Sequence, residues 1–290
     1  MSKKEEHENA LSGLLNEFLK TGHEEGIIDY LVSNSNLPGP RGNLEAAEAF
    51  ADAVEERAKQ DSEALWNLCT RLTLFSPVEA SVNNLKEFLV FCGAQGIGVL
   101  GASTALYPRG LSRLKELAND PRWRTREGVA MALQRLIKKQ PERTLKQLES
   151  WIENSHWLVM RAVIAGVAEP ANLKERKMAG SALELHRKVF AQILATNERK
   201  SNEFKTLRQT LGYSLSVVIS AIPSEGFEYI QQIIDSRDGD LLQITKKNLR
   251  KNRLTRRFPY EVATMKRYLA AQPYGLNANR VTSEPDSNQL

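Results

Sequence analysis

The chain has 290 residues, of which 41% are hydrophobic, and its 40 Lys and Arg against 35 Asp and Glu give a net charge of +5. This length and apolar share are typical of a globular protein with a sizeable core. The first residues carry no apolar run like that of a signal peptide, and no stretch is long and apolar enough to span a bilayer. We therefore expect a cytoplasmic protein that makes no contact with a membrane.

From residue 9 onward, apolar residues recur at the spacing of a helix face. Residues 1–8 are charged and are predicted to be a flexible tail. Further helices are predicted up to residue 105, and a Pro-Gly-Pro loop at 38–40 interrupts them. This loop and its Arg41 could bind a ligand, although a connector between helix layers is the simpler interpretation. Beyond Pro273 the composition is rich in Asn, Ser, Pro and Gln, which predicts disorder.

Cysteine and histidine are too few and too scattered to form a metal centre. Cys69 and Cys92 each lie inside an apolar helical pattern and are predicted to be small core residues. The four histidines show no metal-ligand spacing. We expect neither a metal nor a cofactor.

A glycine motif at residues 96–101 matches the G-x-G-x-x-G pattern of dinucleotide-binding proteins. It follows the apolar run at 88–92, which could form a strand. The remainder of the chain, however, lacks the alternation of strand and helix patterns that such a fold requires. The glycines are better explained by one tightly packed helix.

Two similar stretches follow, each with a capping-type residue, a Trp and an Arg ahead of small apolar residues. The first contains Asp120, Trp123 and Arg126, and Asp120 is predicted to cap its helix. The second begins at Asn154 and contains Trp157 and Arg161. The two openings are 34 positions apart, about the length of one helix pair with its turns.

These stretches resemble HEAT repeats, most clearly in Asp120, Arg126 and the apolar run at 129–133, while a stretch from Asp238 matches less closely. The resemblance implies an all-α fold, a right-handed α-α superhelix or HEAT-like solenoid. Residues 9–105 would be a helical layer continuous with the array, and residues 106–272 the repeats. Residues 273–290 would be a disordered C-terminal tail.

A HEAT-like array offers a curved surface, and the expected function is a non-catalytic scaffold that binds a protein partner. More loosely, the Trp and Arg helices are similar to the HEAT-like DNA alkylation repair glycosylases. That resemblance implies an aromatic cleft from Trp123 and Trp157, with Arg126 and Arg161 gripping phosphate. The family's Trp closely followed by Asp is not found here, which leaves Glu127 or Glu169 as the carboxylate.

We favour the simpler interpretation, in which both Trp side chains fill seams between repeats and both Arg side chains bond to neighbouring turns. An exposed Trp beside a carboxylate and basic residues would instead favour the enzyme. DNA binding, with or without base-excision activity, is therefore the alternative function.

Seven cations without an intervening acid lie near the end of the chain: Lys246, Lys247, Arg250, Lys251, Arg253, Arg256 and Arg257. Several of them recur every three or four residues, so one helix could present them as a stripe that contacts phosphates. The simpler interpretation is a solvated helix end, where cations complement the helix dipole. No catalytic motif stands out in the chain.

Overall fold

The computed structural model describes residues 2–103, 105–153 and 156–271, and over these ranges the chain is all helical, without a strand. The α-helices in chain order are α1 (Lys3–Thr21), α2 (Glu25–Ser33), α3 (Leu44–Arg57), α4 (Ser62–Leu72), α5 (Glu87–Ser103), α6 (Tyr107–Leu117), α7 (Trp123–Lys139), α8 (Pro141–Glu153), α9 (Trp157–Val167), α10 (Arg176–Leu194), α11 (Asn202–Ala221), α12 (Pro223–Asp235), α13 (Gly239–Asn248), α14 (Asn252–Thr255) and α15 (Pro259–Ala271). The predicted all-α class is confirmed.

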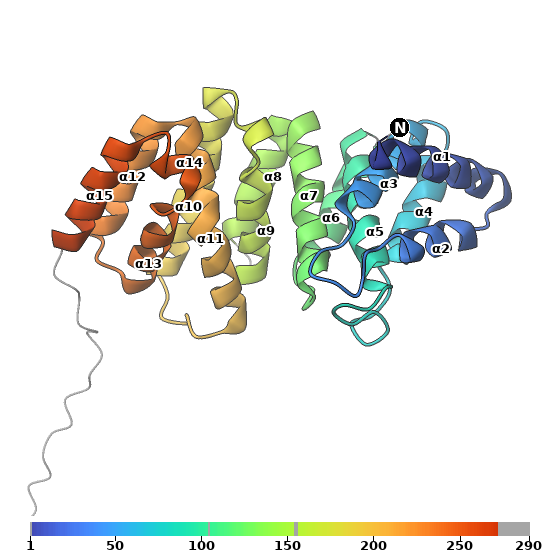
Figure 1. Ribbon diagram of the computed structural model, residues 1–290, viewed down its shortest axis with the longest axis horizontal. Helices are drawn as coiled ribbons and strands as arrows, with labels where there is room; N and C mark the ends of the chain where they lie inside the picture. The colour runs from blue at the N-terminus through green and yellow to red at the C-terminus, as the bar shows by residue number, and fades with distance from the viewer. Residues whose placement is uncertain (1, 104, 154–155, 272–290) are drawn as a thin grey trace, which may run out of the picture.

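The helices form two layers along the length of an elongated molecule (Figure 1). The odd-numbered helices from α1 to α13 contact one another in succession. Each even-numbered helix from α6 to α12 packs against the odd-numbered helices before and after it, and α4 packs against α5. The N-terminal helices therefore lie at one end of the molecule and α15 at the other.

Helix α5 is the centre of the N-terminal half, and 16 of its 17 residues are buried. It contains both the apolar run at 88–92 and the glycine motif, which are therefore helical. A Cβ atom added at Gly98 would lie 2.6 Å from the Cβ of Ala132 on α7. The glycines thus allow close helix packing, as expected. Cys69 and Cys92 are buried and unpaired in the same region.

The first turns of α1 fall within residues 1–8, for which the sequence suggests a flexible tail. Ser2 accepts a hydrogen bond from the Glu5 amide, and the Glu5 carboxylate accepts one from the Ser2 amide at 2.7 Å. This capping box satisfies two amides that would otherwise lack partners, so the charged segment can begin a helix.

The basic run does not lie on a single helix. Helix α13 ends at Asn248, and the chain turns before the short helix α14. The run therefore crosses the end of α13, α14 and the turn after it, and no single helix presents it as a stripe. The predicted tail at 273–290 lies outside the described residues.

Neither a membrane span nor a metal site is found in the described part of the chain. None of its helices combines the length and apolar character needed to cross a bilayer. No group of three or more His, Cys, Asp or Glu side chains is arranged to hold a metal ion there.

Candidate binding pocket at the start of helix α7

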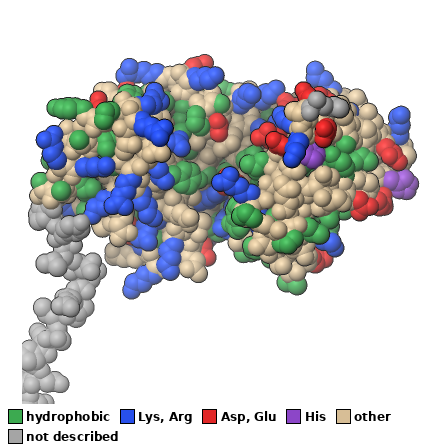
Figure 2. Space-filling view, in the orientation of Figure 1, with side chains coloured by type: hydrophobic (Ala, Val, Ile, Leu, Met, Phe, Trp, Pro, Cys, Tyr) green, Lys and Arg blue, Asp and Glu red, His purple; other side chains and the backbone are tan. Residues whose placement is uncertain are grey.

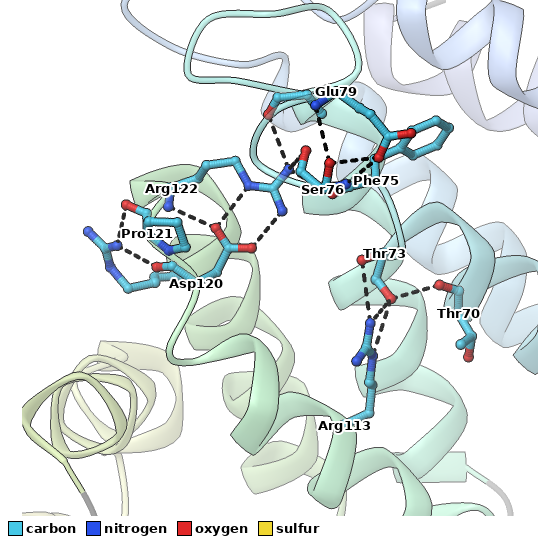
Figure 3. A network of polar contacts seen from close by, with 11 residues as sticks. Thr70, Thr73, Phe75, Ser76, Glu79, Arg113, Asp120, Pro121 and Arg122 are labelled. Atoms are coloured by element: carbon cyan, nitrogen blue, oxygen red, sulfur yellow. Dashed lines mark hydrogen bonds and ion pairs between the residues drawn. The ribbon is translucent and has the colours of Figure 1, made fainter.

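The turn before α7 is fixed by Arg122, which is only 2% exposed. Its guanidinium donates to the Asp120 carboxylate at 2.6 and 2.9 Å, and to the carbonyl oxygens of Phe75 at 3.0 Å and Ala80 at 3.1 Å (Figure 3). The α4–α5 loop is thereby tied to the start of α7. Asp120 does not cap α7 as expected, because its carboxylate accepts from the Arg122 amide and side chain and the helix begins at Trp123.

Arg124, the second residue of α7, ties a second loop to the same place. Its guanidinium donates to Glu87 Oε2 at 2.8 Å, to Asn83 Oδ1 at 2.9 Å and to the Gly39 carbonyl at 2.5 Å. Gly39 belongs to the Pro-Gly-Pro loop, so this loop is fastened to the starts of α5 and α7. The guanidinium also lies 4.4 Å from the centroid of the Trp123 ring, where a cation–π contact helps to orient the indole.

A pocket of about 250 Å³ opens between the Pro-Gly-Pro loop and α7. Phe91, Leu44 and Met131 provide apolar lining, and Trp123 and Glu127 line the same pocket. Trp123 is 43% exposed and Leu44 is 46% exposed, so two large apolar side chains face solvent around one opening. An exposed apolar opening of this kind marks a binding surface more often than an isolated exposed side chain does.

The structure does not bring the four predicted cleft residues into one cavity. Trp123 lies in the pocket described above. Trp157 is half-buried, its ring packs edge-on against Phe204 with centroids 5.3 Å apart, and it lines a different cavity, of about 740 Å³, together with Lys200.

Both predicted phosphate-gripping arginines are buried and bonded to neighbouring backbone. Arg126 donates to the carbonyl oxygens of Asp120 at 2.6 Å and Pro121 at 2.8 Å. Arg161 donates to the carbonyl oxygen of Arg126 and to the Glu127 carboxylate, each at 2.7 Å. Burial, together with nearby Arg161, lowers the pKa of Arg126. These bonds correspond to the interpretation in which the arginines brace adjacent turns.

The two carboxylates considered for catalysis occupy different settings. Glu127 is beside the exposed Trp123 and forms the ion pair with Arg161. The exposed Trp123 beside Glu127 meets part of the arrangement that the glycosylase alternative calls for. Arg161, however, is buried and already bonded to the Arg126 carbonyl and the Glu127 carboxylate, so it is not free to grip phosphate. Glu169 instead accepts a hydrogen bond from the Ala171 amide at 3.2 Å and caps a short 3₁₀ helix.

The basic run is accessible to solvent over most of its length. Lys247, Arg250, Arg253, Arg256 and Arg257 are exposed, and Lys246 and Lys251 are half-buried. No carboxylate within the described residues pairs with any of the five exposed cations. In the view of Figure 2, Lys and Arg side chains gather over α11 and α13.

Sequence reasoning missed the roles of Arg122 and Arg124. One signal was their position on either side of Trp123, in the stretch that follows Asp120 and Pro121. Glu87 offered a second signal, because an acid beside a long apolar run is fully buried only when it is paired. Comparisons with protein-family models, curated proteins and solved structures give no match for this chain.

Proposed function

We propose that this protein is a non-catalytic scaffold that binds a protein partner. The observation that carries this proposal is the pocket beside α7, where Trp123 and Leu44 are exposed around an apolar interior. Aromatic side chains in such settings are frequent anchors of protein interfaces. On this proposal the helices form a HEAT-like right-handed superhelix, and the pocket lies on its binding surface. The successive contacts of the odd-numbered helices support that architecture.

Affinity capture with the full chain, followed by reconstitution, tests the scaffold proposal. The immobilised protein should enrich a specific protein from an extract of the source cells relative to an unrelated helical bait. That protein, once purified, should co-elute with the chain in size-exclusion chromatography. Failure of every enriched protein to form a complex when purified would contradict the proposal.

A second candidate function is DNA binding of the HEAT-like alkylation-repair type, and a different observation favours it. Residues 199–267 contain 14 Lys and Arg against 7 Asp and Glu, whereas residues 1–198 contain 25 against 26. The positive charge is therefore concentrated at one end of the molecule, which includes the exposed basic run. Cations without acidic partners can neutralise phosphates and release the counterions condensed on DNA.

A charge-reversal pair tests the DNA proposal. Replacing Arg250→Glu and Arg253→Glu should weaken binding to labelled duplex DNA on all sequences alike, because phosphate contacts carry no base information. The slope of log affinity against log salt should also fall by about two. The matched control is Lys20→Glu with Lys59→Glu, which makes the same charge change at exposed sites of the N-terminal half. Equal binding by the two double variants would rule out the basic run as the DNA site.

Base excision is a separate part of that alternative and has its own readout. Glu127 is the carboxylate that would stand beside the deoxyribose, because it is next to Trp123. Release of alkylated bases from methylated duplex DNA should then occur and be lost in Glu127→Gln. If the protein binds DNA but releases no base, it is a DNA-binding protein without glycosylase activity.

A further inference from the structure

We propose that the pocket beside Trp123 accepts one large apolar side chain of a partner protein, and that acidic residues flank that side chain in the partner. This inference rests on the proposed scaffold function and specifies the chemistry of its partner. Three properties of the pocket carry it: its size and lining, its rigid walls, and the charge at its rim.

The size of the pocket suits a single side chain. Its volume of about 250 Å³ is below the range of about 300–1,000 Å³ that is usual for small-molecule sites. Phe91 is buried and Met131 half-buried, so the interior of the pocket gives a polar group few hydrogen-bond partners. A Leu, Phe or Trp side chain would remove from water both its own surface and the exposed parts of Trp123 and Leu44.

The walls of the pocket are already fixed before a partner binds. Arg124 holds the Gly39 carbonyl on one side and stacks on the Trp123 ring on the other. The Asn43 amide donates to the Ser35 carbonyl at 3.0 Å, which closes the base of the loop. A rigid site loses little conformational freedom on binding, so more of the contact energy contributes to affinity.

Once the ion pairs around the pocket are counted, the charge that remains at its rim is positive. Arg124 is paired with Glu87, and Glu127 is paired with Arg161 at 2.7 Å. Arg41 is exposed and has no hydrogen bond or ion pair with any residue that the structure describes. An uncompensated cation at the edge of an apolar pocket favours a partner that carries carboxylates beside its apolar anchor.

Selection from a phage-displayed library of random dodecapeptides, with the full chain as bait, tests this inference. The selected peptides should share a large apolar residue flanked by Asp or Glu. In anisotropy titrations with a labelled selected peptide, Trp123→Ala should weaken binding about tenfold or more, as the loss of an interface anchor does. Arg41→Glu should also weaken it, and selection on that variant should yield basic flanking residues instead.

Two matched variants serve as controls, and circular dichroism confirms that all variants fold. Tyr260→Ala removes an aromatic ring that is 75% exposed elsewhere, and Lys20→Glu reverses an exposed cation on α1. Neither should change peptide affinity. If Trp123→Ala and Arg41→Glu bind the peptides as the wild type does, the pocket inference is overturned while the scaffold function stands.

Other outcomes separate the remaining possibilities. Absence of any enriched peptide overturns the inference, and the scaffold function is then judged by its own co-elution test. If Trp123→Ala and Arg41→Glu weaken binding of labelled duplex DNA and leave peptide binding unchanged, the pocket belongs to a DNA surface and the inference fails.

Discussion

A single buried residue, His186 on α10, is expected to make the stability of the protein depend on pH. It is fully buried, with Nδ1 2.8 Å from the Ala182 carbonyl and Nε2 3.0 Å from Ser214 Oγ. The carbonyl can only accept, so Nδ1 carries the hydrogen and Nε2 accepts from the Ser214 hydroxyl. A neutral ring therefore satisfies both contacts, and burial lowers the pKa of His186 to about 4.

This shift predicts a loss of stability in mild acid. Below about pH 6.5 the unfolded chain binds a proton at His186 that the folded chain does not, so stability falls until the pH reaches about 4. Between about pH 7 and pH 5 the free energy of unfolding should fall by about 2 kcal/mol from this residue alone. Urea titrations of the wild type and His186→Gln at both pH values measure it.

The difference between the wild type and His186→Gln isolates the contribution of His186, because all other titrating groups are common to both proteins. His186→Gln should be less stable at neutral pH but should lose less stability on acidification. An identical decrease in the two proteins would show that His186 takes up its proton in the folded state.

At the scale of the helices, apolar period and glycine spacing were sufficient to predict the all-helical class and the packed helix over residues 96–101. The basic run was expected to end the helix that begins near Asp238, but the residue at which α13 ends could not be predicted. Lys and Arg are as compatible with a helix as with the turn at 249–251. The role of Asp120 was also missed. An Asp before a helix is normally a cap, but here the neighbouring Arg122 takes the carboxylate.

The pocket could not be predicted from the sequence. Its lining comes from Pro40, Phe91 and Trp123, which belong to separate parts of the chain. Their meeting depends on the bonds that Arg122 and Arg124 make to distant loops. Arg41 was recognised as part of a loop that could bind, but nothing in the sequence placed Trp123 beside it. Local pattern fixes where helices form, whereas long-range polar contacts decide which loops meet.

The close approach of α5 and α7 leads to a prediction about Gly98. In Gly98→Ala the new Cβ would lie 2.6 Å from the Cβ and 2.7 Å from the Cα of Ala132, so the two helices must move apart. Overpacking of this kind costs about 1–3 kcal/mol. Chemical denaturation should show this loss of stability.

Gly180 on α10 supplies the matched control, since a Cβ added there meets nothing within 4 Å. Gly180→Ala should therefore stabilise the protein by about 0.5–1 kcal/mol, because alanine loses less conformational freedom in a helix. Similar effects of the two substitutions would mean that the α5–α7 contact is looser than the structure indicates.

At the scale of the whole molecule, stability should vary along the array. In a two-layer arrangement of this kind each helix depends mainly on its neighbours, so the ends can open without the centre. Helix α5 has neighbours on several sides and is buried over nearly its whole length, whereas Val262 is the only buried residue of α15. We therefore predict that α15 amides exchange with deuterium first and α5 amides last.

Hydrogen-exchange mass spectrometry under native conditions measures this order directly. Peptides from α15 should exchange through local opening, at rates that denaturant changes little, because such openings expose little new surface. Peptides from α5 should exchange only through global unfolding and respond steeply to denaturant. The protein should then lose α15 without losing the pocket beside α7, because no wall of that pocket comes from the C-terminal helices. Equal protection of α5 and α15 would instead mean that the array unfolds as one cooperative unit.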